Sequence, residues 1–240
     1  MMYFAVFVLL SLFILIHEFG HFYIAKRAGI PIARFSVGIG PALWSYEFGG
    51  TEYRLSAIPI GGYVMVDLQS DDSFFKVDAS KRIAFALGGP AANLLAACAA
   101  FGAFNCVTQG ASLYGLFIAP IEQTGHALAT IMINVPQLFL NTGQVSGVVG
   151  LVAQGGDFVA GSLVRALQLS VVLNLNLAVV NMLPIPPLDG GKVVLYALEK
   201  LNGGLARLHI PLSAAGWILI LGTLAYVTLQ DVRRIIVGFV

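Results

Sequence analysis

Charged residues are scarce in this sequence. Asp, Glu, Lys and Arg together make up only 10% of the 240 residues, whereas soluble domains contain about 25%. Hydrophobic residues reach 58%, and the mean hydropathy is +0.86. This composition excludes an ordinary soluble domain and indicates an integral membrane protein that meets the lipid bilayer. The net charge of +1 gives no sign of a nucleic-acid partner, and we expect none.

Cysteine is also rare. The two cysteines, Cys98 and Cys106, fall in or at the end of one apolar segment. They lack the close paired spacing of a zinc site or a disulfide framework, so we interpret them as packing residues. A signal peptide is not indicated either, because the first apolar run has no basic start and no small-residue cleavage site. We therefore expect this run to be retained as a first span.

Long apolar runs, in contrast, are plentiful. A helix needs about 20 mostly apolar residues to cross a bilayer, and four stretches meet this length, at about 1–25, 83–107, 163–183 and 211–229. Residues 33–66 contain two β-rich runs around a glycine turn and are too apolar to lie in water. The sequence thus predicts a multi-pass α-helical membrane protein with about four transmembrane helices. A membrane-associated β region lies between helices 1 and 2.

The basic residues indicate an orientation. Ten Lys and Arg occupy the connections 26–82 and 190–210, whereas none occurs from Thr108 to Val164. Because cytoplasmic loops are enriched in Lys and Arg, we expect the two basic connections in the cytoplasm. The connection 108–162 and both termini are then expected outside. This orientation predicts a protein of the bacterial inner membrane with its active site toward the cytoplasm.

The connections carry further expectations. Within the outer-face connection we expect a surface helix that Pro136 interrupts, followed by a glycine-rich loop at 142–157. A fifth span in this connection remains open. The acidic segment 67–80 is expected to be a solvated loop. Glycines 88 and 89 before Pro90 are expected to kink the second span or to let a neighbouring helix approach closely.

The first apolar run contains the motif His17-Glu18-Phe19-Gly20-His21. Positions i and i+4 lie on one face of a helix, so His17 and His21 can share one zinc ion. Glu18 lies beside the first histidine, where it can accept a proton from a metal-bound water. Charged groups are costly inside a membrane, so a chance match of this three-position pattern is a weaker interpretation than a functional site.

A third ligand is needed, since catalytic zinc usually has three protein ligands and one water. Apart from Glu18, Asp189 is the carboxylate near a span without an obvious role in solvent. The prolines at 184, 186 and 187 cannot continue a regular helix, and they are expected to unwind the chain just before it. The alternative is that Asp189 only caps a helix that starts near Gly190.

HEFGH in the first span, together with NMLPIPPLDG at 181–190, resembles the site-2 proteases, which are intramembrane zinc metalloproteases. The resemblance is closest to the bacterial sigma-E protease type and covers nearly the whole chain, including the GGPAANLL segment of the second span. It implies that one zinc ion is held by His17, His21 and Asp189 and that Glu18 is the catalytic base. It also implies that Asn181 and Pro184 help to hold the substrate.

One departure from that family is visible. Members of the sigma-E type usually carry PDZ domains between the second and third core spans, and the connection 108–162 is too short for a PDZ domain of about 90 residues. We therefore expect a single intramembrane metalloprotease domain over residues 1–240, without a PDZ domain. Its expected activity is the cleavage of transmembrane segments in single-span membrane proteins, such as anti-sigma factors or remnant signal peptides.

Two other classes of function remain open. A catalytically inert zinc-binding scaffold would not need Glu18, because a structural zinc site closes with four protein ligands. A metal transporter would spread ionisable residues along several spans, whereas here they converge at one depth. Metal analysis combined with cleavage of a single-span substrate separates the three functions.

The run 51–66 suggests how a substrate is held. It is rich in β-forming residues and follows the first span closely, so an open strand edge can lie near the zinc and pair with an unwound substrate. Gly61 and Gly62 would let another backbone approach, with Tyr63 beside them. The alternative is that these glycines only form a turn.

Overall fold

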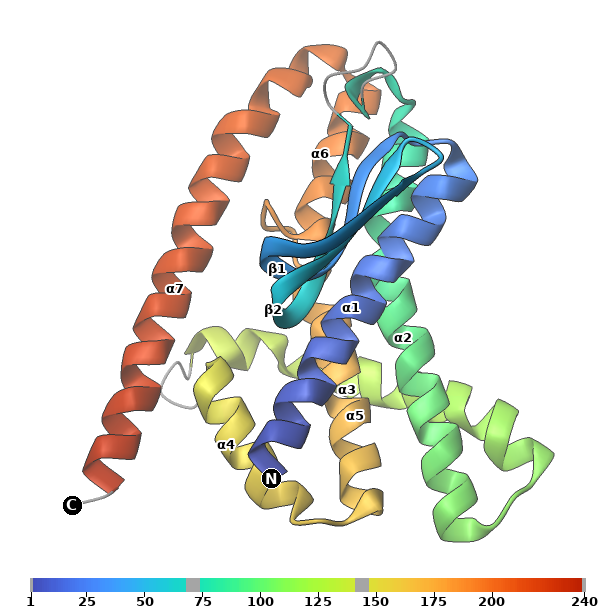
Figure 1. Cartoon of the computed structure of the whole chain (residues 1–240), viewed down its shortest axis with the longest axis vertical. Coiled ribbons are helices and arrows are strands. Elements are labelled where there is room, and N and C mark those ends of the chain that lie inside the picture. Colours follow the sequence, from blue (N-terminus) through green and yellow to red (C-terminus); the bar gives the residue numbers. More distant parts are fainter. Residues whose placement is uncertain (1, 68–73, 141–146, 239–240) are drawn as a thin grey trace.

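The computed structural model describes residues 2–67, 74–140 and 147–238. Most helices run along one long axis, and a small sheet lies beside the first of them (Figure 1). The elements in chain order are α1 (Met2–Ala28), β1 (Ile32–Phe48), β2 (Thr51–Val66), the 3₁₀ turn η1 (Phe74–Lys76), α2 (Ala79–Gln109), the π-helical turn η2 (Tyr114–Ile118), α3 (Ala119–Leu140), α4 (Val148–Val159), α5 (Leu163–Asn181), α6 (Asp189–Leu201), the 3₁₀ segment η4 (Gly203–Leu208) and α7 (His209–Gly238).

The four predicted spans correspond to α1, α2, α5 and α7, and the sheet lies between α1 and α2 as expected, so the predicted fold class is confirmed. At 1.5 Å per residue, the 27 residues of α1 are about 40 Å long, which exceeds the hydrocarbon thickness of about 30 Å. The start of α2 is capped by Asp78, whose carboxylate accepts the Ser80 N–H at 2.8 Å. The other end of α2 stops at Gly110.

A fifth stretch, at 114–134, is also long and apolar enough to cross a membrane by its length and composition. It includes much of α3, which runs across the long axis that α1, α2 and α5 follow (Figure 1). The predicted interruption at Pro136 is wrong, because α3 continues to Leu140. A proline removes one backbone hydrogen bond, and in apolar surroundings the remaining groups still have no better partner than the helix.

The glycine-rich loop predicted at 142–157 is also wrong where the chain is described. Residues 148–159 form α4, whereas 141–146 lie outside the described residues. The carboxylate of Asp231, on α7, accepts hydrogen bonds from the backbone N–H groups of Gly147 and Gly150, both at 2.9 Å. A side chain from a distant helix thus caps α4, which the local sequence does not show.

The predicted acidic loop at 67–80 needs a similar correction. Residues 68–73 lie outside the described residues, but the rest is not simply solvated. Phe74 in η1 is buried and packs edge-on against Phe85 and Tyr196, with ring centroids 5.7 and 6.0 Å away. This segment therefore belongs to an apolar cluster that joins α1, α2 and α6.

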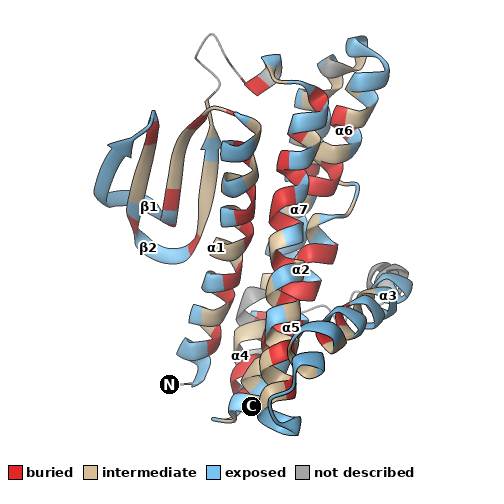
Figure 2. Ribbon diagram, turned by 90° about the vertical axis from the view of Figure 1, so that its right-hand side faces the viewer, coloured by how far each residue is buried: buried red, intermediate tan, exposed pale blue. Residues whose placement is uncertain are grey.

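Helices α1 and α2 approach each other closely where two glycines meet. A Cβ atom added at Gly20 would collide with the Gly88 carbonyl and lie 2.6 Å from the Ala92 Cβ, and one at Gly88 would lie 2.7 Å from the Gly20 carbonyl oxygen. This confirms the expected close approach at the glycines of the second span. The buried residues of α1 and α2 gather where these helices face each other (Figure 2), and that contact turns the histidine face of α1 toward α2.

The sheet is formed by two long, bent strands that pair antiparallel, with the expected turn at Gly49 and Gly50. Residues 34–37 of β1 have partners on both sides, because they pair with 52–55 and also with 62–65. The last part of β2 is consequently an outer edge of the sheet. It is also the part of the sheet next to α1 (Figure 2).

Candidate metal centre

The histidines of α1 lie on its buried face. His17 and His21 are 6% and 5% exposed, whereas Phe19 and Tyr23 on the same helix are about half exposed. One helical turn separates the two imidazoles, and their Nε2 atoms are 3.1 Å apart. The helical period thus presents both Nε2 atoms to the protein interior and leaves Phe19 and Tyr23 on a more exposed face of α1.

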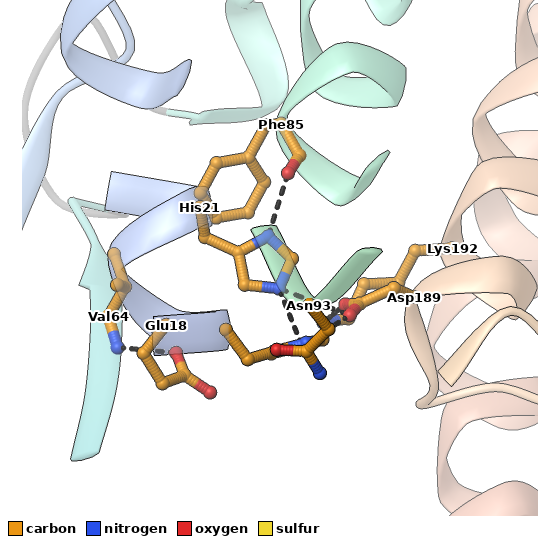
Figure 3. Close-up of polar contacts among 8 residues, drawn as sticks. Glu18, His21, Val64, Phe85, Asn93, Asp189 and Lys192 are labelled. Atoms are coloured by element: carbon orange, nitrogen blue, oxygen red, sulfur yellow. Dashed lines mark hydrogen bonds and ion pairs between the residues drawn. The ribbon is translucent and has the colours of Figure 1, made fainter. Parts of the chain in front are cut away.

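Asp189 reaches the same point from the other end of the sequence. Helix α5 ends at Asn181, and the proline-rich segment that follows leads to α6, which begins at Asp189. The Asp189 Oδ2 atom lies 2.9 Å from His17 Nε2 and 3.1 Å from His21 Nε2. The carboxylate therefore faces both histidines. A residue that only capped α6 would not make these two contacts. Figure 3 shows the arrangement, with Asp189 entering from α6 opposite α1.

The donor set suits a zinc ion. Within the described ranges, these three residues form the group that can hold a metal, with ligand atoms within 4.8 Å of one another, and all three are buried. Atoms that bind one zinc tetrahedrally at 2.0–2.1 Å lie about 3.3–3.4 Å apart. The observed separations of 2.9–3.1 Å are slightly shorter. Two imidazoles and one carboxylate leave a fourth position for water, as in catalytic zinc sites.

Helix α2 faces the other side of each imidazole. The backbone carbonyl of Phe85 lies 2.7 Å from His21 Nδ1, and the side-chain amide of Asn93 lies 3.4 Å from His17 Nδ1. Gly89 lies between them on the helix. A Cβ atom there would lie 2.6 Å from His17 Nε2 and would collide with His21 Nε2. Glycine at this position therefore leaves the room that the centre occupies.

The second oxygen of Asp189 has a partner of its own. Lys192, three residues later on α6, donates a hydrogen bond from Nζ to Asp189 Oδ1 at 3.0 Å. One carboxylate oxygen thus faces a cation and the other faces the histidines. The spacing of three residues between Asp189 and Lys192 places both on one face of α6, and this spacing is visible in the sequence.

Glu18 points away from α2, toward the sheet. Its Oε2 atom accepts a hydrogen bond from the backbone N–H of Val64, at 3.1 Å. The edge of β2 and the glutamate of the histidine motif are therefore in direct contact (Figure 3). The sequence placed the β region near the histidines but did not indicate this contact.

The predicted substrate residues Asn181 and Pro184 lie at the end of α5 and in the segment that leads to Asp189. Asn181 is the last residue of α5 and is partly buried, and Pro184 is exposed in the segment that leads to α6. Among the described residues, neither of them is hydrogen-bonded to the two histidines or to Asp189. Their proposed role must therefore come into effect when a substrate is present.

The residues predicted on the β edge lie beside α1. Gly61 has a positive φ of 57°, and a Cβ atom there would lie 3.0 Å from the Ile14 Cβ. A Cβ atom at Gly62 would lie 3.1 Å from the Leu15 Cδ1. Tyr63 pairs with Ser36 inside the sheet. The two glycines thus form a bend and allow close packing against α1.

Known proteins resemble this chain. The family model for peptidase family M50 matches residues 4–222. A candidate zinc metalloprotease of Xylella fastidiosa is 42% identical over 95 residues, which cover 35% of this chain and 21% of that protein. Protease RseP of Yersinia pestis is 41% identical over 104 residues, and the regulator of sigma-E protease RseP of Escherichia coli is 39% identical over 104 residues. Each of these two matches covers 39% of this chain and 23% of the relative.

Proposed function

Because the chain belongs to peptidase family M50, we propose that it is a zinc-dependent endopeptidase that cleaves transmembrane segments within the bilayer. The matched stretches cover less than a quarter of the length of the relatives named above. The convergence of His17, His21 and Asp189 carries the proposal. These residues come from segments more than 160 positions apart and bring three ligand atoms to one buried point.

The ligands and the base have separate tasks. His17, His21 and Asp189 would hold the ion through two Nε2 atoms and one carboxylate oxygen. Zinc, when bound, lowers the pKa of a coordinated water to about 7 and polarises a carbonyl. Glu18 takes a proton from the attacking water and passes it to the nitrogen of the leaving amine. The relatives' names, which include zinc metalloprotease, support this choice of metal.

The carbonyl oxygen of the substrate gains negative charge during attack and needs a partner. The side-chain amide of Asn181, at the end of α5, is the donor we assign to it. Pro184, exposed in the following segment, would hold the substrate chain nearby. Both residues belong to the segment that leads directly to Asp189, so a substrate bound there lies next to the metal ligands.

The outer edge of β2 would hold the unwound substrate as an added strand. A helical substrate must first unwind, and its freed N–H and C=O groups then need partners. In an antiparallel strand, neighbouring residues direct their backbone groups to opposite edges. The Val64 N–H points outward and donates to Glu18. The backbone groups of Gly62, two residues earlier, therefore also point outward, whereas those of Tyr63 point to the inner strand. In this arrangement the substrate pairs beside the catalytic base.

The substrates would be membrane proteins with a single span, such as anti-sigma factors or remnant signal peptides, and the membrane would be the bacterial inner membrane. The ten basic residues of the connections 26–82 and 190–210 support an orientation in which these segments face the cytoplasm. The end of α1 that carries the histidines then lies toward the cytoplasm. Water would reach the centre from that side.

The decisive experiment combines two measurements on the purified protein. We expect about one zinc ion per chain and cleavage of a single-span substrate in detergent or liposomes. An inert scaffold would hold zinc without cleaving any substrate, and a transporter would move zinc across liposomes without cleavage. Absence of cleavage from a zinc-loaded protein, tested on several single-span substrates, would count against a protease.

A further inference from the structure

Asn93, on α2, is a buried polar residue that the reaction described above leaves without a role. It is 0% exposed, and its side-chain nitrogen lies 3.4 Å from His17 Nδ1. Its side-chain oxygen, Oδ1, is buried and has no hydrogen-bond partner among the described residues. A buried amide oxygen without a partner is uncommon in folded proteins and calls for an explanation.

The chemistry of histidine supplies one. An imidazole that binds a metal through Nε2 carries its proton on Nδ1, and that proton is normally donated to a fixed acceptor. For His21 the acceptor is the Phe85 carbonyl oxygen, 2.7 Å from Nδ1. Since His17 directs Nε2 to the same point as His21, its Nδ1–H also needs an acceptor. Asn93 is the side chain that faces this atom.

The two ends of an amide group have nearly the same shape, and their assignment follows from the hydrogen bonds they make. With the amide nitrogen toward His17 Nδ1, two donors would face each other once Nδ1 carries the proton. Rotation of the amide by half a turn about Cβ–Cγ brings Oδ1 to the imidazole N–H instead. This rotation gives the buried oxygen its partner and fixes the orientation of the His17 ring.

The positions on α2 fit this role. Phe85, Gly89 and Asn93 are spaced by four residues, so they follow one face of the helix. The Phe85 carbonyl contacts the His21 imidazole, and the Asn93 side chain contacts that of His17. Gly89, between them, leaves room for both rings. One face of α2 therefore contacts both histidines of α1.

We propose that Asn93 is a positioning residue of the metal centre, whose side-chain oxygen accepts the Nδ1–H of His17 and so holds Nε2 toward His21 and Asp189. This inference rests on the proposal that these three residues bind zinc. It does not depend on which substrate is cleaved.

Zinc affinity, measured by competition with a chromogenic chelator in detergent, tests the role. Asn93→Leu has a similar volume but no acceptor, and the loss of such an outer partner typically weakens metal binding about 10–100-fold. Asn93→Asp keeps the acceptor and should retain zinc nearly as well as the unmodified protein.

Asn174→Leu is the matched control. Asn174 is also 0% exposed with an unpaired Oδ1, but its amide nitrogen bonds to the Ser170 carbonyl in its own helix. Its replacement should leave zinc affinity unchanged.

A second measurement does not depend on any variant. In the zinc-loaded protein, imidazole ¹⁵N NMR should show His17 protonated at Nδ1 and metal-bound at Nε2. The inference is wrong if His17 binds zinc through Nδ1, if Asn93→Leu retains zinc like the unmodified protein, or if Asn174→Leu loses it equally. Failure of the protease proposal alone looks different, since the protein would then bind zinc, with the Asn93 effect intact, and cleave nothing. A protein that binds no zinc would contradict both proposals.

Discussion

The carboxylate of Glu18 and the backbone N–H of Val64 are hydrogen-bonded, with Oε2 and N 3.1 Å apart. This contact joins the predicted catalytic base on α1 to the outer edge of β2. It also shows that the Val64 N–H of that edge points away from the inner strand and toward α1. Any substrate strand that pairs with this edge would lie next to Glu18. The substrate would then be bound beside the group that is proposed to transfer the proton.

Val64→Pro removes this edge donor. Because the N–H points away from the inner strand, we expect the sheet and the zinc content to be retained and cleavage to fall about tenfold or more. Val64→Ala keeps the N–H and should cleave almost normally. Equal cleavage rates for the two variants would rule out a role for this edge. Tyr63→Pro, which replaces a residue paired with Ser36, should instead destabilise the sheet, visible as increased proteolysis of 32–66.

Glu18→Gln separates binding from chemistry. The amide has the shape of the carboxylate but cannot accept the proton, and the loss of a general base typically lowers the rate about 10²–10⁴-fold. The three proposed ligands are unchanged, so zinc content measured by metal analysis should match that of the unmodified protein. Cleavage at the normal rate would show that Glu18 is not the base.

Asp189→Ala removes one of the three proposed zinc ligands. We expect zinc affinity to fall by a factor of about 100 or more, together with activity, because two histidines alone leave two positions open. Asp157→Ala is the matched control, since Asp157 bonds to the Tyr3 hydroxyl far along α1 from the centre. Chelator competition provides the measurement. Unchanged zinc affinity in the Asp189 variant would remove this residue from the ligand set.

Gly89→Ala tests the space on α2. The added Cβ atom would collide with both imidazoles, so the histidines must shift, and we expect zinc affinity to fall about tenfold or more. Gly222→Ala places the same change in α7, where a Cβ atom would meet no other atom within 4 Å, and it should have no effect on zinc. A zinc affinity in Gly89→Ala equal to that of the control would mean that the centre tolerates the methyl group.

The orientation can be tested with single cysteines in a protein whose Cys98 and Cys106 have been replaced. Ser112→Cys lies in the connection expected outside, and Asn202→Cys lies in one expected inside; both positions are exposed. A membrane-impermeant maleimide added to intact cells should label the first and spare the second. The reverse pattern would overturn the proposed orientation and the side from which water enters.

The sequence by itself determined the elements with strong local signals. The spacing of His17 and His21 placed both on one face of α1, and Gly49-Gly50 predicted the turn between the strands. The apolar runs predicted four of the described helices that are long and apolar enough to cross a membrane. The prolines before Asp189 predicted the break between α5 and α6. These features depend on residues within a few positions of one another, and the helical period or the geometry of proline and glycine fixes them.

Tertiary structure alone decided which distant groups meet. Asp189 reaches the histidines because α6 packs against α2, and Asn93 reaches His17 because Gly20 and Gly88 bring two helices together. The glycine-rich segment at 148–159 is a helix because Asp231 caps it from α7 and because an apolar environment offers its backbone no other partners. Such contacts arise from packing between segments far apart in the chain, and no local pattern specifies them.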